Sequence, residues 1–311
     1  MATLPSMNTI MGRLHARQLR LLVALGDHCS LLNAAKEVSM SQPGASKALR
    51  EIESIFGAEL FTRTNRGLEP NAIGDCVIRY ARVFQTDMEH LREELVSVMR
   101  GTGGRVTAGA IMGAIPLLTT AITSLLMTQS DISVEVVEDT SAALLTLLDG
   151  GRIDLALCRT SVSRTPSLYQ SDKVQRESLS VVANAEHALV KRKRVQLEEL
   201  AEARWIVYRA NMPIRRLLER EFYDAGLRVP LHLIETTSAF TTMCLLQQNE
   251  HFVAMLPTDV ADNFTAQGWA RTLAVPIGSR SEPYELVTRA NAKSSPGASM
   301  LITEIRKHAV L

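Results

Sequence analysis

The sequence predicts a two-part protein: a small, mostly α-helical N-terminal domain that continues into a long helix, and a larger α/β domain. Three observations support this prediction. Short amphipathic helical patterns fill residues 13–70, one uninterrupted helical pattern covers residues 71–100, and short apolar strands alternate with helices from residue 105 onward. The chain has 311 residues, and since this is roughly twice the length of a typical domain, we expect two separate hydrophobic cores.

Composition limits the possible functions. The 34 Lys and Arg residues nearly balance the 33 Asp and Glu residues, so any surface that binds nucleic acid must be a local feature. The four cysteines lie far apart, without a CxxC pair or a histidine at metal-ligand spacing. We therefore expect reduced thiols, no metal and no cofactor.

The N-terminal segment shows no export signal. The first residues, MATLPSMNTIMGRLHAR, lack the continuous apolar core of a signal peptide, and no later stretch reaches 18 uninterrupted apolar residues. We expect a cytoplasmic protein with no membrane partner. Residues before about Arg13 are expected to form a flexible lead-in, and Met7 or Met11 are alternative starts.

Two short helices and a turn precede the most informative helix. Residues 17–27 and 31–38 carry apolar side chains at helical spacing, and small residues in the second segment allow close helix packing. Ser39-Met40-Ser41 breaks the second helix. Ser41 is then a suitable N-cap for a third helix, with Pro43 in the first turn, where its missing N–H is not needed.

The third helix, which ends at Gly57, has two chemically different faces. Its apolar face consists of Ala45, Ala48, Leu49, Ile52, Ile55 and Phe56. Its other face displays Gln42, Pro43, Ser46, Lys47 and Arg50. Glutamine can pair with adenine through two hydrogen bonds, a proline ring can meet a thymine methyl group, and the cations can bind phosphate or guanine. Such a helix after a short turn is the helix-turn-helix arrangement.

A short strand and a basic hairpin follow the third helix. Residues 59–61 predict the strand, and the hairpin carries Arg63 and Arg66, which would lie along the DNA backbone or in the minor groove. Residues 13–70 are therefore predicted to be a winged helix-turn-helix domain. The predicted DNA-binding residues are Arg17, Gln42, Pro43, Ser46, Lys47, Arg50, Arg63 and Arg66. Each one taken alone could be a solvated surface side chain, and the small excess of basic residues suggests that affinity needs two copies.

This motif resembles a known family. Residues 17–74, which include the run SQPGASKALREIESIFGAELFTRTNRGLEPNAIG, look like the winged helix-turn-helix of LysR-type transcriptional regulators. One difference lies at Asn71, where the family more often has threonine, but both residues cap helices. The resemblance implies a transcriptional regulator whose partners are promoter DNA and RNA polymerase.

The helix predicted over residues 71–100 carries a narrow apolar seam. Its members recur at alternating steps of four and three residues, and they are Val77, Ala81, Phe84, Met88, Leu91, Leu95 and Val98. We interpret the seam as a dimer contact between two such helices; the alternative is a helix packed on its own domain. At 1.5 Å per residue the helix spans about 45 Å, and the Gly-Thr-Gly-Gly segment at residues 101–104 then forms a hinge.

Residues 105–311 have the pattern of a parallel α/β domain. Strands are predicted at 105–110, 132–139, 153–159, 179–183, 205–209, 231–236, 252–257 and 285–289. Helices are predicted at 116–128, 141–148, 213–224, 239–248 and 260–267, and after Pro296. The order suggests two lobes joined by two chain crossings, with lobe I formed by residues 105–163 and 279–311 and lobe II by residues 164–278.

Polar residues at the strand ends are candidates for binding a small molecule, because ligands bind beyond the carboxyl ends of such strands. The predicted effector-binding residues are Met112, Thr140, Ser141, Arg159, Arg209, Asn211, Thr236, Thr237, Ser238 and Pro257. The serine and threonine residues could instead be helix caps, and the two arginines could be surface charges.

The LysR resemblance extends through this region and implies a periplasmic-binding-protein-like effector domain, with the effector in a cleft between the lobes. The phrases VVEDTSAALLTLLDGGRIDLALCR and ETTSAFTTMCLLQQNEHFVAMLPTDVADNF look most like the galactose-binding-protein regulators and their aromatic-catabolism relatives. The expected assembly is a dimer or a dimer of dimers.

The strand-end arginines, together with helix N-termini at Ser141 and Pro213, favour a small anion such as an organic or aromatic acid. A neutral sugar stays open as an alternative, because the hydroxyl groups at 236–238 and Asn211 could bind one without either arginine.

Two other function classes deserve comparison. One is an α/β enzyme or a transport binding protein with an accessory domain. A catalytic role would need a nucleophile beside a base, paired carboxylates, metal ligands or a phosphate loop, and Gly101–Gly104 lacks the Lys-Ser/Thr of a P-loop. A redox-sensing regulator would need reactive thiols, whereas Cys158 and Cys244 are predicted in a strand and a helix interior, where burial makes thiols inert.

Overall fold

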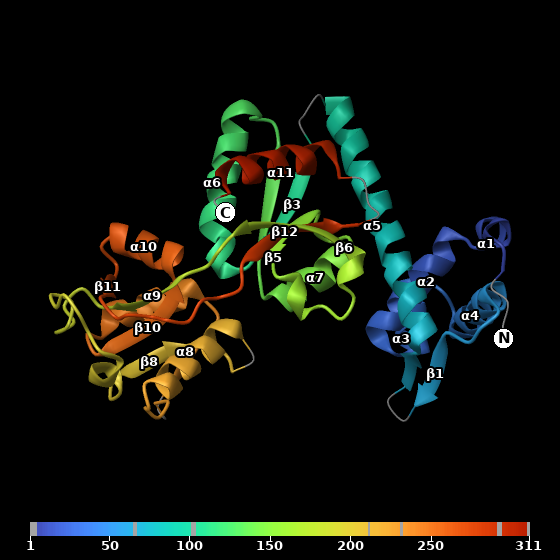
Figure 1. Cartoon of the computed structure of the whole chain (residues 1–311). Helices are drawn as coiled ribbons and strands as arrows, with labels where there is room; N and C mark the ends of the chain where they lie inside the picture. The colour runs from blue at the N-terminus through green and yellow to red at the C-terminus, as the bar shows by residue number, and fades with distance from the viewer. Residues whose placement is uncertain are drawn as a thin grey trace. The chain divides into compact units, whose positions relative to one another are not determined.

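The computed structural model describes residues 5–64, 67–100, 104–210, 212–230, 233–290 and 294–309. Within the long helix, it describes the backbone alone at residues 90, 93, 94, 97, 98 and 100. The chain divides into two compact units, residues 1–105 with 146–153, and residues 106–145 with 154–311 (Figure 1). Each unit is described below by itself.

The first unit contains the predicted helix-turn-helix, wing and long helix. Its elements are α1 (Met7–Arg13), α2 (Ala16–His28), α3 (Leu31–Glu37), α4 (Gln42–Phe56), β1 (Phe61–Thr64), β2 (Gly67–Pro70) and α5 (Ala72–Arg100). Helix α1 corrects the expected flexible lead-in. The Ser6 hydroxyl accepts a hydrogen bond from the N–H of Thr9 at 3.3 Å and caps this helix, and α1 contacts α4.

The core of the first unit lies between α2, α3, α4 and the start of α5. It contains the buried apolar residues Leu21, Leu22, Leu25, Ala34, Ala45, Leu49, Ile52, Ile78 and Ala81, among others. Four of the six residues predicted for the apolar face of α4 are buried, and Ala48 and Phe56 are half-buried against the same core. The 3.6-residue period of α4 therefore determines which face remains available.

Local hydrogen bonds set the ends of α4 and the position of the wing. The Ser41 hydroxyl accepts from the N–H of Gly44 at 3.2 Å, and Gly57 ends the helix in the left-handed region at φ 66°. The Glu53 carboxylate accepts from the N–H of Leu60 at 2.9 Å, which ties the first strand of the wing to α4.

The first turns of α5 belong to the core of the same unit. Asn71 caps the helix, because its side-chain oxygen accepts from the N–H groups of Ile73 and Gly74, both at 2.9 Å. Ala81 is fully buried against α2, and Val77 packs against the same cluster. These two predicted seam residues are thus corrected to core residues, since the packing partner is α2 of the same chain.

The second unit contains two five-stranded sheets among its described residues. The first sheet has the order β4 (Ser133–Glu138), β3 (Arg105–Ala110), β5 (Leu155–Cys158), β12 (Tyr284–Arg289) and β6 (Tyr169–Gln175). The second has the order β11 (Arg271–Leu273), β7 (Leu179–Ala183), β10 (Phe252–Pro257), β8 (Arg204–Val207) and β9 (Ile234–Glu235). The helices are α6 (Ile115–Thr128), α7 (Ser141–Asp149), α8 (Pro213–Asp224), α9 (Ala239–Gln248), α10 (Thr258–Ala266) and α11 (Pro296–His308).

These sheets form two lobes with the predicted alternation of strands and helices. In the first lobe β3 and β5 are parallel, β12 is antiparallel to β5, and α6 contacts α11. In the second lobe β8 lies parallel to β10, and α8, α9 and α10 contact β10 (Figure 1). Strand β5 is buried along its whole length and β10 is buried after its first residue, which explains their continuous apolar sequences.

Strand β6 corrects the predicted boundary between the lobes. It pairs with β12 along its whole length, so residues 169–175 belong to the first lobe, although residue 164 was expected to start the second. The segment YQSDKVQ is mostly polar because β6 is an edge strand with exposed side chains, and no strand was predicted there. Strand β9 is shorter than the predicted 231–236, and residues 231 and 232 lie outside the described part.

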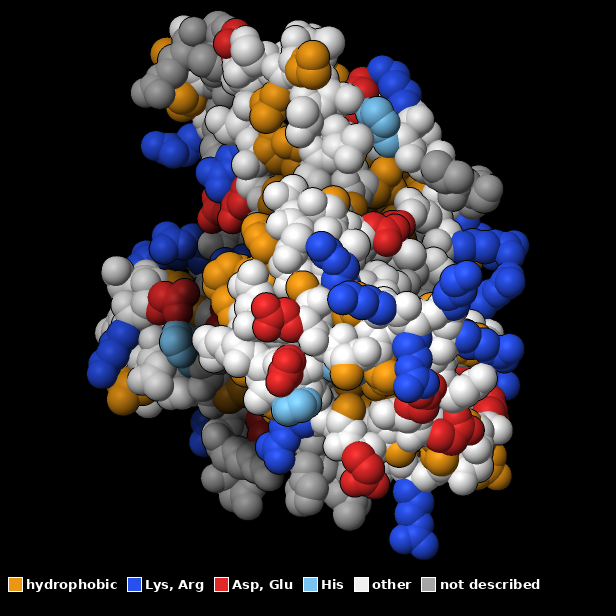
Figure 2. All heavy atoms as spheres, turned by 90° about the vertical axis from the view of Figure 1, so that its left-hand side faces the viewer, with side chains coloured by type: hydrophobic (Ala, Val, Ile, Leu, Met, Phe, Trp, Pro, Cys, Tyr) orange, Lys and Arg blue, Asp and Glu red, His pale blue; other side chains and the backbone are white. Residues whose placement is uncertain are grey.

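Among the helices that the structure describes, none combines the length and the apolar character needed to cross a bilayer. The face seen in Figure 2 carries Lys, Arg, Asp and Glu side chains interspersed with small groups of hydrophobic ones. This mixture agrees with the near balance of charge in the sequence.

We predict that Gly74→Ala destabilises the first unit. A Cβ at this position would lie 2.0 Å from the backbone oxygen of Leu60, so the wing or α5 must move, at a cost of about 1–3 kcal/mol. Urea unfolding followed by circular dichroism measures this cost. Gly12→Ala is the matched control, because nothing lies within 4 Å of the added Cβ in α1. Equal stability of the two variants would contradict the prediction.

Candidate functional site

The predicted reading face of α4 is exposed. Gln42, Pro43, Lys47 and Arg50 are exposed and Ser46 is half-buried. The Lys47 side chain is 81% exposed, and its nearest acidic partner, Glu51, lies one turn later at 4.0 Å. A weak pair of this kind leaves the ammonium group available to another anion.

Two of the predicted DNA-binding arginines make contacts within the first unit. Arg50 donates from Nη2 to the Ser46 hydroxyl at 3.4 Å, one turn earlier on α4. Arg17 donates from Nη2 to the backbone oxygen of Ser39 at 3.2 Å, which ties the start of α2 to the turn before α4. Both side chains stay exposed, so these contacts orient the guanidinium groups without removing them from solvent.

The wing is fixed against the end of α2. Leu68 donates its backbone N–H to the oxygen of Cys29 at 2.8 Å. Gly67 has φ 126°, and a Cβ there would lie 2.3 Å from the same oxygen, so the close approach requires glycine. Arg63 is exposed on β1. Arg66, at the tip, lies outside the described residues.

Beyond Ala81, the predicted seam of α5 is exposed. Phe84, Met88, Leu91 and Leu95 are between 43% and 55% exposed. The side chain of Val98 lies outside the described part of α5. These four apolar side chains therefore form an uncovered row along the helix.

Most of the hydroxyl groups predicted to bind the effector act as local caps. The Thr140 hydroxyl accepts from the N–H of Ala143 at 3.3 Å, Thr236 from that of Ser238 at 3.1 Å, and Ser238 from that of Thr241 at 3.1 Å. Thr237 is exposed. The oxygens of Thr140, Thr236 and Ser238 thus accept local backbone N–H groups, as the alternative of helix caps predicts. Each of these hydroxyl groups still has a proton that it can donate to a ligand.

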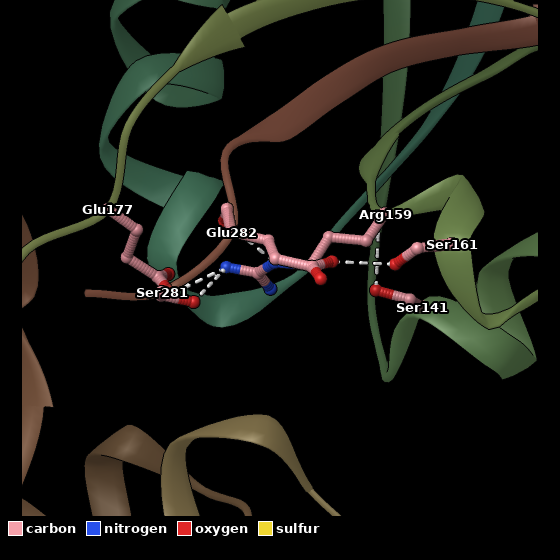
Figure 3. A network of polar contacts seen from close by, with 6 residues as sticks. All are labelled: Ser141, Arg159, Ser161, Glu177, Ser281 and Glu282. Carbon is pink, nitrogen blue, oxygen red and sulfur yellow. Dashed lines mark hydrogen bonds and ion pairs between the residues drawn. The ribbon is translucent and has the colours of Figure 1, made fainter. Parts of the chain in front are cut away.

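Arg159 is the centre of a buried polar network (Figure 3). Its Nη2 donates to a carboxylate oxygen of Glu177 at 2.6 Å and to the Ser281 hydroxyl at 2.8 Å, and its Nε donates to the backbone oxygen of Glu282 at 3.0 Å. Its backbone N–H donates to the Ser141 hydroxyl at 3.2 Å. The guanidinium therefore has a counter-ion within the chain, which weighs against the predicted role as an open anion clamp.

The network joins the two segments that cross between the sheets. Glu177 lies between β6 of the first sheet and β7 of the second, and Ser281 and Glu282 lie on the return between β11 and β12. Sequence reasoning missed Glu177 and Ser281, because a single acid or serine in a loop gives no signal before its distant partner is known.

Met112 and Pro257 come together near these crossings. The Tyr208 hydroxyl, at the end of β8, donates to the sulfur of Met112 at 2.6 Å. Burial, followed by the charges of Glu177 and Glu138, raises the pKa of Tyr208, so its hydroxyl remains a hydrogen-bond donor. A Cβ at Gly113 would lie 3.2 Å from Pro257 Cγ. Residues from both lobes therefore meet where an effector was expected.

The remaining predicted effector residues are less well defined. Arg209 is exposed, and its guanidinium makes no hydrogen bond or ion pair to any residue in the described ranges. Asn211 lies outside those ranges. The structure thus brings Met112, Ser141, Arg159 and Pro257 to one region, and it places Arg209 on the surface.

The four thiols are free and differ in burial, with Cys158 buried, Cys29 and Cys244 half-buried and Cys76 exposed, so the expected burial of Cys244 is only partial. Burial, and secondarily the charge of Glu285, raises the pKa of Cys158 to about 12, so this thiol stays protonated and unreactive. No group of three or more His, Cys, Asp and Glu residues is arranged there to hold a metal ion.

Comparisons with known proteins agree with this architecture. The LysR substrate binding domain model matches residues 100–310, and the model of bacterial regulatory helix-turn-helix proteins of the lysR family matches residues 16–75. The HTH-type transcriptional regulator GbpR of Azospirillum brasilense is 31% identical over 299 residues, which cover 95% of this chain and 86% of that protein. The HTH-type transcriptional regulator GalR of Pseudomonas putida is 29% identical over 298 residues, which cover 94% of this chain and 73% of that protein.

Solved structures show the same fold. The crystal structure of CbnR, a LysR family transcriptional regulator, superposes with a TM-score of 0.62 at 18% identity, covering 96% of this chain and all 100% of that one. A second structure holds full-length CbnR complexed with its target DNA and has the same TM-score of 0.62. With both family models and a 31% identical relative in agreement, the chain belongs to the LysR family, as a DNA-binding transcriptional regulator with an effector-binding domain and not as an enzyme.

Proposed function

We propose that this regulator recognises its operator through the exposed face of α4, as a dimer joined along α5, and that a small effector bound between the two lobes changes this binding. The observation that carries the proposal is the division of α4 into a buried apolar face and an exposed face with Gln42, Lys47 and Arg50. That division leaves amide and cationic groups on the surface of the second helix of the motif, where helix-turn-helix proteins read the major groove.

The exposed groups suit different parts of DNA. Gln42, at the start of α4, can make two hydrogen bonds to an adenine edge, whereas Lys47 and Arg50 can neutralise phosphates. Arg63 on the wing and Arg17 on α2 add cations outside α4. The complex of CbnR with its target DNA supports DNA as the partner of this fold.

The exposed row on α5 supports self-association. Phe84, Met88, Leu91 and Leu95 follow each other at steps of four and three residues, and none is buried within the chain. Pairing two such helices would remove this apolar surface from water. We propose a dimer, which also doubles the number of DNA contacts, and a dimer of dimers as the larger assembly.

The proposed effector position is the region where Met112, Ser141, Tyr208 and Pro257 meet. The lobes also touch there through the Gln175 amide, which donates to the Asp259 carboxylate at 2.6 Å. A ligand held between the lobes can bias their arrangement through its unequal affinity for two states. As the family resemblance implies, we also propose RNA polymerase as a partner and the cytoplasm as the location.

Gln42→Ala is expected to weaken discrimination between the operator and unrelated DNA by about 1–3 kcal/mol, because the direct base contact is lost. Fluorescence anisotropy with operator and scrambled duplexes at one salt concentration measures the ratio of the two affinities. Normal discrimination by this variant would place the reading face elsewhere.

Lys47→Ala is expected to weaken binding to operator and scrambled DNA alike. The slope of log affinity against log salt should flatten by about one unit, because one phosphate contact is lost. Glu51→Ala is the matched control, since it removes the acidic partner that Lys47 has among the described residues without removing a cation. A larger loss for operator than for scrambled DNA would show that Lys47 reads bases instead.

Met88→Asp or Leu91→Asp is expected to disrupt the dimer. Burying a carboxylate between paired helices costs several kcal/mol of association free energy. Sedimentation velocity at micromolar protein concentration measures the change, and Arg92→Asp, an exposed position outside the seam, controls for added charge. An unchanged oligomer in the two seam variants would refute the role of α5.

A further inference from the structure

The proposed effector region already contains a buried carboxylate that the chain itself supplies. The side chains of Arg159 and Glu177 are only 7% and 3% exposed, and they are joined by an ion pair of 2.6 Å. Arginine does not lose its proton in proteins, so a buried guanidinium needs a counter-ion. Glu177 is that counter-ion, and Arg159 therefore has no uncompensated charge to offer an acidic ligand.

The second oxygen of the same carboxylate fills space beside the first lobe. A Cβ at Gly113 would lie 1.9 Å from Oε1 of Glu177 and 3.2 Å from Cγ of Pro257. The carboxylate thus lies against the backbone of Gly113, next to Met112 and its contact with Tyr208. Figure 3 shows the Glu177 side chain directed at the guanidinium of Arg159, the group that a ligand carboxylate would be expected to meet.

Two further acidic groups lie on the two lobes, Glu138 exposed at the end of β4 and Asp259 half-buried at the start of α10. Burial raises the pKa of Glu138, and burial followed by the charge of Asp262 raises the pKa of Asp259. The charges of Glu177 and Glu138 both contribute to the raised pKa of Tyr208. An incoming carboxylate would meet these like charges, and their repulsion opposes its binding.

Uncharged hydrogen-bonding groups are available in the same region. The oxygens of Thr140 and Ser141 each accept a backbone N–H, from Ala143 and Arg159 respectively, and each hydroxyl keeps its proton to donate. The exposed cation at the strand ends, Arg209, is screened by solvent. Hydroxyl groups of a neutral ligand can use these donors without displacing Glu177.

We infer that Glu177 takes the place of an effector carboxylate, and that the cleft accepts an uncharged, hydroxyl-bearing small molecule instead of an organic acid. The inference rests on the proposed function, which locates the effector between the lobes. Of the two effector classes that the sequence left open, the geometry favours the neutral one, because the anion-binding side chain is already neutralised from within.

Chemical rescue of Glu177→Ala tests this assignment on the full chain. The substitution removes the carboxylate and leaves room for acetate beside Arg159. We expect a lower Tm than in the wild type, and a saturable rise of about 2–4 °C on adding sodium acetate, relative to sodium chloride at equal ionic strength. The wild type should show no saturable rise with acetate, benzoate or glucuronate.

Glu282→Ala is the matched control. Its carboxylate is exposed and accepts from the Ser161 hydroxyl at 2.8 Å in the same network, so its removal should create no response to acetate. If Glu177→Ala does not fold in chloride, the yield of refolded protein is compared instead, and acetate but not chloride should restore it.

The same response in the wild type and in Glu177→Ala overturns the inference. A rise in both shows that the anion position is open in the native protein, and a rise in neither shows that a small anion cannot take the place of Glu177. Failure to refold in acetate counts equally against it. Operator binding by Gln42→Ala tests only the DNA-reading part of the proposed function, which does not involve Glu177, so a failure there is distinguishable from a failure of acetate rescue.

Discussion

The buried guanidinium of Arg159 is the constraint on which the α/β unit depends. A permanently charged group that is removed from water must be paired, and breaking such a pair costs about 3–5 kcal/mol. Its partners come from both chain crossings, Glu177 on the first and Ser281 on the second. Because one side chain holds both crossings at the end of β5, the two sheets are connected at a defined place, and the proposed effector position lies beside that connection.

The first unit depends on a simpler constraint, the burial of one face of each helix. Leu21, Leu25 and Ile52 leave no exposed surface, so rotating α4 about its axis would bring apolar groups into water. The position of Gln42 and Lys47 on the surface is therefore a consequence of packing on the opposite face. Short polar contacts, from Glu53 to Leu60 and from Asn71 to Gly74, add the wing and α5 to this core.

Much of this architecture is predictable from sequence because its signals are local. Helices α8 and α9 begin and end where predicted, since Pro213 marks one start and Ser238 caps the other. The features that the sequence did not predict correctly depend on residues far apart in the chain. Edge strand β6 has little apolar pattern of its own, and it exists because β12 pairs with it. Arg159 at a strand end resembles a ligand-binding arginine until its partner, 18 positions later, is seen to lie beside it.

An unknown packing partner also explains why the seam of α5 was only partly predicted. A heptad pattern identifies side chains that need an apolar partner, but it does not say whether the partner belongs to the same chain. For Ala81 the partner is α2, whereas Phe84, Met88, Leu91 and Leu95 remain 43% to 55% exposed among the described residues.

The cations Arg159 and Lys47 differ in the same way. Arg159 is neutralised by a buried carboxylate of its own chain, whereas Lys47 has only a weak contact in solvent. In the first unit, the groups left over after internal pairing include the exposed face of α4 and the exposed row of α5. Surfaces of these two kinds bind a polyanion and a second apolar helix respectively, so the internal contacts of the fold determine which external partners the regulator can recognise.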